Sequence, residues 1–84
     1  MVQSVRKVVA RVVKVNHAAF VVEGDEVIVS ENLDVESEVL HPELSLMMVQ
    51  DAAIQILERP PHIQFKKYSL ADGVVDVVFE LVQA

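Results

Sequence analysis

The sequence ADGVVDVVFELV, residues 71–82, alternates side chains in the manner of a β-strand. One face of this strand would carry Val75, Val77, Phe79 and Leu81, and the other Val74, Asp76, Val78, Glu80 and Val82. The second face is half apolar, which is more than a water-facing surface needs. Asp72-Gly73 comes just before it, and an Asp-Gly pair is a strong signal for a type I′ hairpin turn, which requires positive φ. The sequence therefore predicts a hairpin over residues 62–83, in which residues 62–70 pair with residues 74–83.

The partner segment 62–70 changes phase along its length. Ile63 and Phe65 share one parity, whereas Tyr68 and Leu70 share the other. One extra residue in a strand turns every later side chain to the opposite face of the sheet. We therefore expect a β-bulge near Lys66-Lys67, which would bring both apolar pairs to the same face.

Upstream of this hairpin the chain changes character. Valine suits a pleated, half-buried surface, yet the sequence has none between Val49 and Val74. Pro42 is well placed for the first position of a helix. The pair Pro60-Pro61 would stop the helix, because proline disfavours helical geometry in the residue before it. The pattern predicts a helix over residues 42–58.

The first 30 residues are predicted to form a β-meander. Apolar residues in segment 4–15 recur at helical spacing, but most of them are valines, and we prefer a strand there to a helix. Asn16-His17 would turn this strand into a second one, Ala18–Glu23. Gly24 would then turn the second strand into a third, Glu26–Ser30.

The acidic connector, residues 31–41, links this meander to the helix, and the sequence leaves its conformation open. The full pattern, β-β-β-α-β-β, predicts one domain over residues 1–84. Its fold class is α+β, a small two-layer sandwich in which one helix packs across an antiparallel sheet.

The predicted helix carries apolar side chains around most of its circumference. At 100° per residue, the stripe expected to face the sheet is Leu46, Val49, Ala52, Ala53, Ile56 and Leu57. Four more would lie among the polar residues on the outer side: Leu44, Met47, Met48 and Ile54. Three explanations stay open: another segment of the chain covers this outer group, the group is an interface with a second copy or another protein, or the predicted phase of the helix is wrong. The interface hypothesis also includes the apolar residues on the second face of the last strand, Val74, Val78 and Val82.

Composition limits the classes of function. The chain has 84 residues, 52% of them hydrophobic and 24% charged, and no cysteine, so it holds no disulfide or thiolate metal site. No apolar run approaches the length that crosses a bilayer, and basic residues interrupt the N-terminal apolar residues, so no targeting segment is predicted. We expect a cytoplasmic protein with no membrane association. Small cores often gain stability by dimerisation.

Charge is segregated along the chain. Residues 16–58 contain no lysine or arginine, and the formal net charge is −6. This balance disfavours nucleic-acid binding, which normally needs a positive surface, although an acidic decoy of nucleic acid stays an alternative. Basic groups that could contact an anion are Arg6, Lys7, Arg11, Lys14, Lys66 and Lys67. The first four could instead pair with the acidic middle of the same chain or of a second copy.

No pattern of residues indicates catalytic or metal chemistry. His17, His41 and His62 lack the spacing that places two imidazoles on one metal ion, and we expect them at turns, caps or the surface. The carboxylates between Glu23 and Glu38 lack the calcium-loop pattern. The sequence has no nucleophile motif and too few glycines for a phosphate-binding loop. No cofactor is predicted.

The sequence favours a small, non-enzymatic protein-interaction module. It would act as a homo-oligomer such as a dimer, or as a regulator or inhibitor of a larger protein. A second hypothesis is a small-ligand or nucleic-acid binder that uses Phe65–Tyr68, where aromatic and basic residues adjoin. A third is an enzyme whose site forms between subunits from a histidine and a carboxylate.

Overall fold

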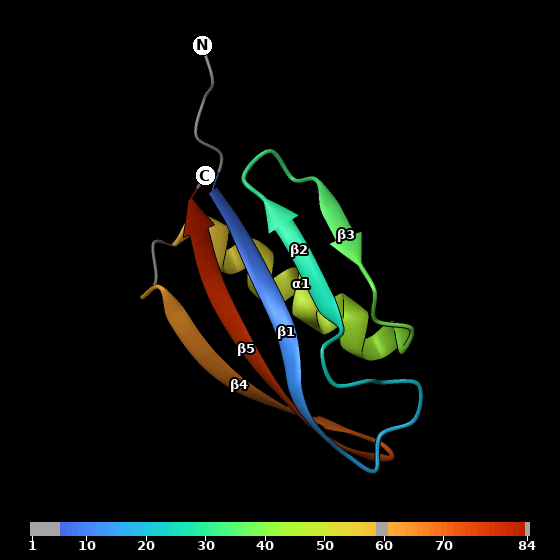
Figure 1. Ribbon diagram of the computed structural model, residues 1–84. Helices are drawn as coiled ribbons and strands as arrows, with labels where there is room; N and C mark the ends of the chain where they lie inside the picture. Colours follow the sequence, from blue (N-terminus) through green and yellow to red (C-terminus); the bar gives the residue numbers. More distant parts are fainter. Residues whose placement is uncertain (1–5, 59–60, 84) are drawn as a thin grey trace.

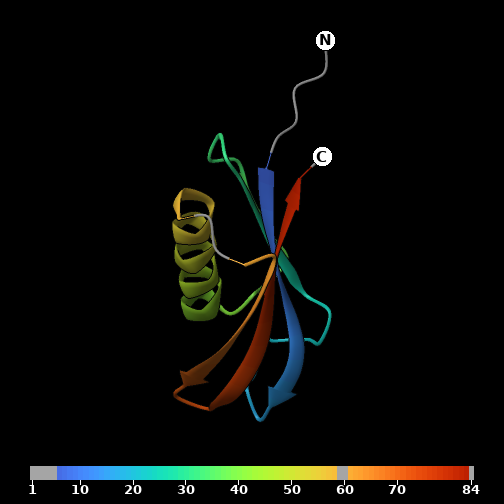
Figure 2. The ribbon, with the colours of Figure 1, turned by 90° about the vertical axis from the view of Figure 1, so that its left-hand side faces the viewer.

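The computed structural model describes residues 6–58 and 61–83, which form one antiparallel sheet and one helix (Figure 1). The elements in chain order are β1 (Arg6–Asn16), β2 (Glu26–Ser30), β3 (Val35–Ser37), α1 (Pro42–Leu57), β4 (Ile63–Leu70) and β5 (Gly73–Gln83). The strand order across the sheet is β3-β2-β1-β5-β4. The helix lies on one face of the twisted sheet, as Figure 2 shows. This arrangement confirms the predicted α+β fold and its β-β-β-α-β-β order.

The core lies between α1 and the three central strands. Leu44, Met48, Ala52 and Ile56 are buried and four residues apart, so they form one inclined row along the helix. The strands supply mostly small, branched side chains opposite this row: Val8, Ala10, Val12, Val27, Val29, Val75, Val77 and Phe79. In the part of the chain that the structure describes, no helix is both long enough and apolar enough to cross a membrane.

The N-terminal strand prediction is confirmed for the residues that the structure describes, because Arg6–Asn16 is a strand and not a helix. Residues 4 and 5 of the predicted strand lie outside them. The predicted second strand, Ala18–Glu23, is wrong. β1 instead pairs directly with β2, with Arg11 opposite Glu26. The intervening loop cannot continue as a strand, because its residues His17 and Phe20 have φ of 69° and 61°.

The third strand of the sheet in chain order, β3, lies inside the acidic connector. Residues Val35–Ser37 form β3, which pairs with β2 at one edge of the sheet. The turn before it is closed by Ser30, whose hydroxyl accepts a hydrogen bond from the backbone N–H of Asp34. The alternation in this part of the sequence is too weak to predict a strand of three residues.

The predicted helix bounds, 42–58, agree with the structure, in which α1 ends at Leu57 and Glu58 is the C-cap. His41 is the N-cap, and its Nδ1 accepts a hydrogen bond from the backbone N–H of Leu44 at 3.2 Å. The predicted phase of the helix is wrong. Leu57 was expected to face the sheet but is 80% exposed, whereas Leu44 and Met48 were expected to face outward but are fully buried.

The predicted C-terminal hairpin is confirmed, but its details differ. The β4–β5 register runs without interruption from Ile63 opposite Glu80 to Leu70 opposite Gly73, so the bulge predicted at Lys66-Lys67 is absent from this pair. Gly73 has no positive φ, so the type I′ prediction is also wrong. Glycine is needed there because a Cβ atom would lie 2.2 Å from the backbone oxygen of Asn16.

The unbroken register fixes the two faces of β4. Tyr68 lies on the side of the helix, because its hydroxyl reaches Asp51 of α1. Side chains two residues apart share a face of a strand, so Gln64, Lys66 and Leu70 point to the same side. Ile63, Phe65, Lys67 and Ser69 point to the side of the sheet that the helix leaves uncovered. We call this side the outer face.

Candidate functional site

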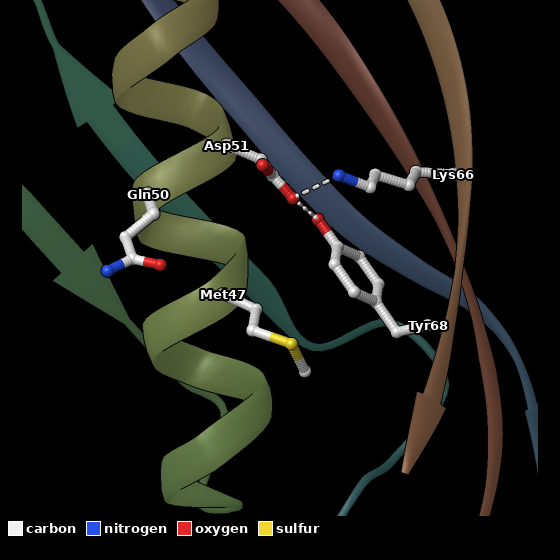
Figure 3. Close-up of a pocket in the computed structure, with 5 residues that line it drawn as sticks. All are labelled: Met47, Gln50, Asp51, Lys66 and Tyr68. Carbon is white, nitrogen blue, oxygen red and sulfur yellow. Dashed lines mark hydrogen bonds and ion pairs between the residues drawn. The ribbon is translucent and has the colours of Figure 1, made fainter.

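Two surfaces beside β4 are candidates for function, one on each side of the sheet. The first is a cavity of about 260 Å³ between α1 and β4, drawn in Figure 3. Its lining residues are Met47, Gln50, Asp51, Lys66 and Tyr68. A smaller hollow of about 160 Å³ continues it along the helix toward Glu58 and Gln64. Together they form a groove along the side of the helix that faces β4.

Asp51 is the centre of the polar contacts in this groove. Its Oδ2 accepts a hydrogen bond from Lys66 Nζ at 2.8 Å and a second one from the Tyr68 hydroxyl (Figure 3). The lysine ammonium also lies 5.3 Å from the centroid of the tyrosine ring, which is within cation–π range. These contacts tie the edge strand β4 to the helix.

The electrostatics of this cluster favour a structural role. Burial raises the pKa of Tyr68 above its ordinary value, and the hydrogen bond and negative charge of Asp51 raise it further. The hydroxyl therefore stays protonated at neutral pH and donates to Asp51, so it is available neither as a base nor as a nucleophile. Among the described residues, no group of three or more histidines and carboxylates is placed to hold a metal ion.

The second surface is an apolar patch on the outer face, at the edge formed by β4 and β5. Phe65 of β4 lies opposite Val78 of β5, and Ile63 lies opposite Glu80. On β5, Glu80 is flanked on the same face by Val78 and Val82. Ile63 is 65% exposed and Phe65 is 60% exposed, although both are large apolar side chains. We call Ile63, Phe65, Val78 and Val82 the β4–β5 patch.

The residues predicted as an interface separate into three groups. Leu44 and Met48 were predicted as interface residues, and this prediction is wrong, because both are fully buried in the core. Met47 and Ile54 line the groove between α1 and β4. The remaining three, Val74, Val78 and Val82, lie together on the outer face of β5, and two of them belong to the β4–β5 patch.

The basic residues predicted as anion contacts are not brought together. Arg6 pairs with Glu31 at 3.2 Å and also donates to the backbone oxygen of Ile56, near the end of the helix. Arg11 pairs with Glu26 at 2.7 Å. These pairs confirm, for the two arginines, the alternative that the basic stripe is paired within the fold.

The lysines are divided between the two sides of the sheet. Lys66 is in the groove, whereas Lys67 and Lys14 flank Asp76 in the strand register of the outer face. Lys7 lies opposite Val82 on the same face. No single anion site therefore includes all six basic residues.

Sequence reasoning missed the contact between Asp51 and Tyr68. Asp51 is one of the polar residues that the helical pattern places on the outer side of the helix, and the expected bulge would turn Tyr68 to the same side as Phe65. The hairpin turn could have indicated this contact. Leu70 directly precedes a turn of two residues, and Tyr68, two residues before Leu70, must point to the same face of the sheet as Leu70. With that parity, the polar tip of a buried tyrosine needs a partner on the helix.

The chain was compared with three sets of known proteins. Models of protein families, curated proteins and solved structures all yield no match to it. A function for this chain has to be inferred from its own residues.

Proposed function

We propose that this protein is a non-catalytic protein-interaction module that binds its partner through the β4–β5 patch. The observation that carries the proposal is the exposure of Ile63 and Phe65, side by side on one face of an edge strand. A monomer gains nothing from two large apolar side chains in water. Burying each of them in a complex stabilises it by about 1.5–3 kcal/mol. The partner is a second copy, or a larger protein that the module regulates or inhibits.

The charges around the patch support recognition of a protein surface. Lys67 and Asp76 lie in the next row of the register, and Glu80 lies opposite Ile63. The apolar centre is therefore bordered by both signs of charge, which is the usual composition of a protein interface. Charged residues at the border of an interface determine the orientation of the partner more than they raise the affinity.

The nucleic-acid and small-ligand hypothesis has less support. It requires Phe65, Lys66, Lys67 and Tyr68 to act together, but alternate residues of a strand point to opposite faces. Tyr68 is buried against Asp51, and Lys66 is paired with the same carboxylate. Only Phe65 and Lys67 remain together on the outer face.

The test compares the protein with two single variants in extracts of the source cells. Phe65→Ser removes the centre of the patch, and Leu57→Ser removes an even more exposed apolar side chain on the helix as a control. Differently tagged copies of the chain are expressed together, so that self-association is counted as partner binding. We expect quantitative mass spectrometry to find a partner that is lost with Phe65→Ser and kept with Leu57→Ser. A set of captured proteins that is the same for all three forms would refute the proposal.

A further inference from the structure

The edge of β4 away from β5 is a free row of backbone hydrogen-bonding groups. Among the described residues, β4 is the last strand of the sheet and pairs with β5 alone (Figure 1). The backbone N–H of Leu81 donates to the oxygen of His62 at 2.8 Å, so His62 points its backbone groups toward β5. In an antiparallel ladder this direction alternates along the strand. The backbone groups of Ile63, Phe65, Lys67 and Ser69 therefore point away from the sheet.

This edge is longer than a protein normally leaves open. The opposite edge, β3, has three residues, whereas β4 has eight. Long edges invite pairing with another chain, and lysines on the edge are a common device against it. Here Lys66 and Lys67 stand in the middle of β4, so they decide which pairings are tolerated.

A second copy can pair with this edge about a twofold axis only in certain registers. Residues opposite each other in antiparallel strands share a face, so the axis must lie midway between one residue of β4 and the same residue of the second copy. An axis at Lys66 or Lys67 would place two ammonium groups directly opposite each other, which is destabilising. An axis at Tyr68 brings together side chains that are already buried. An axis at Phe65 avoids both problems.

We propose that a second copy of this chain adds to the free edge of β4, antiparallel, with Phe65 opposite Phe65 of the partner subunit. The inference rests on the proposed function, for which it names the partner. The backbone groups of Phe65 already point to the edge, so this register forms about six new backbone hydrogen bonds between the subunits. It also joins the two β4–β5 patches into one apolar surface.

The charges of the chain fit this register. Lys67 would lie opposite Ile63 of the partner subunit, whose own neighbour in the sheet is Glu80. On the helix side, Lys66 would lie opposite Gln64 of the partner subunit, which shares a hollow with Glu58. Each lysine thus faces an uncharged residue with a carboxylate next to it.

The helices leave room for the second copy. The helix packs mainly against β1 and β2, which are two and three strands away from β4 (Figures 1 and 2). A twofold axis perpendicular to the sheet keeps both helices on the same side, over the far strands of each subunit. The dimer would be one continuous sheet of two five-stranded halves.

The test measures the mass of the 84-residue chain by sedimentation velocity at concentrations up to about 1 mM, where a weak dimer is still visible. We expect a dimer for the unmodified chain. Phe65→Lys and Phe65→Glu should each raise the Kd at least about tenfold, because each places like charges opposite each other. An equal mixture of the two variants should associate again, because only this register brings residue 65 against residue 65.

Two further variants provide a charge control and a second test of the same register. Leu57→Lys makes the same change of net charge on the helix and should leave the Kd unchanged. Ile63→Lys places an ammonium group opposite Lys67 of the partner subunit and beside its own Glu80, so it should fold and weaken the dimer. Ile63→Lys replaces the Phe65 variants in the test if those variants do not give the circular dichroism spectrum of the folded chain.

The outcomes separate this inference from the proposed function. A chain that is a monomer up to about 1 mM, or a dimer that Phe65→Lys and Ile63→Lys leave intact, overturns the β4-edge dimer. If capture of another protein still depends on Phe65 in that case, the proposed function stands with a different partner. Failure of the mixed variants to associate overturns the register.

Discussion

Replacing Tyr68 with phenylalanine tests the contact that ties β4 to the helix. The substitution removes one hydroxyl and leaves the ring in place, so the apolar packing is unchanged. A hydrogen bond to a charged group contributes about 1.5–3 kcal/mol. Asp51 would keep its bond to Lys66, and its side chain is 22% exposed to water, so the lower end of this range applies. We expect Tyr68→Phe to lower the free energy of unfolding by about 1–2 kcal/mol at pH 7.

The same contact predicts how stability depends on alkaline pH. The pKa of Tyr68 is raised in the folded protein, whereas the unfolded chain ionises near its ordinary value of about 10. Above that pH the unfolded state has lost a proton that the folded state keeps, so stability falls as pH rises. At pH 11 this term is about 1.4 kcal/mol. The stability advantage of the unmodified protein over Tyr68→Phe should therefore shrink to near zero between pH 9 and 11.

Urea unfolding of both proteins at several pH values measures this difference directly. Tyr68 is the single tyrosine of the chain, and there is no tryptophan, so tyrosinate absorbance reports its ionisation alone. Lys66→Met is a suitable control, because it removes the ion pair and leaves the tyrosine contact. A difference between the unmodified protein and Tyr68→Phe that stays constant through pH 11 would refute the assigned hydrogen bond. Tyrosinate absorbance that rises near pH 10 while the protein is still folded would do the same.

Two further substitutions test the packing of the fold, each measured by urea unfolding. Gly73→Ala should destabilise the protein by about 1–3 kcal/mol, because the new Cβ would lie 2.2 Å from the backbone oxygen of Asn16 and the loop must move. A loss below a few tenths of a kcal/mol would show that this loop yields freely. Leu44→Ala should lower stability by about 2–5 kcal/mol, since the side chain is fully buried, whereas Leu57→Ala should change it by less than about 0.5 kcal/mol. Equal losses for the two would contradict the observed phase of the helix.

The sequence contains enough to predict β1, β2, the helix and the last hairpin, but neither β3 nor the phase of the helix. Proline and valine placement set the bounds of α1 and of the last hairpin, because both residues act locally on the backbone. The side of α1 that faces the sheet depends on packing, and apolar residues lie on most of its circumference. Leu46 and Leu57 were as plausible in the core as Leu44 and Met48. The buried row follows the angle at which the helix crosses the twisted sheet, which no local pattern records.

The N-terminal meander failed for a related reason. Segment Ala18–Glu23 is apolar enough for a strand, but β1 pairs better with Glu26–Ser30, whose alternation matches its own. The loop between them keeps Val21 buried, so its apolar character serves as an anchor and not as a strand. The site was missed for one further reason, because the contact of Asp51 with Tyr68 depends on a register that was predicted with a bulge.

That register also explains why the β4–β5 patch exists. The turn at Ala71 and Asp72 places Leu70 opposite Gly73, and the hydrogen bond from Tyr68 to Asp51 holds the same register farther along the strand. With Tyr68 inside, Phe65 lies three residues away and must be outside. A slip by one residue would bury Phe65 but would turn Tyr68 into water and break its bond to the helix. The exposure of Phe65 is thus coupled to the burial of Tyr68, and a slip of the strand would only exchange one exposed aromatic side chain for another.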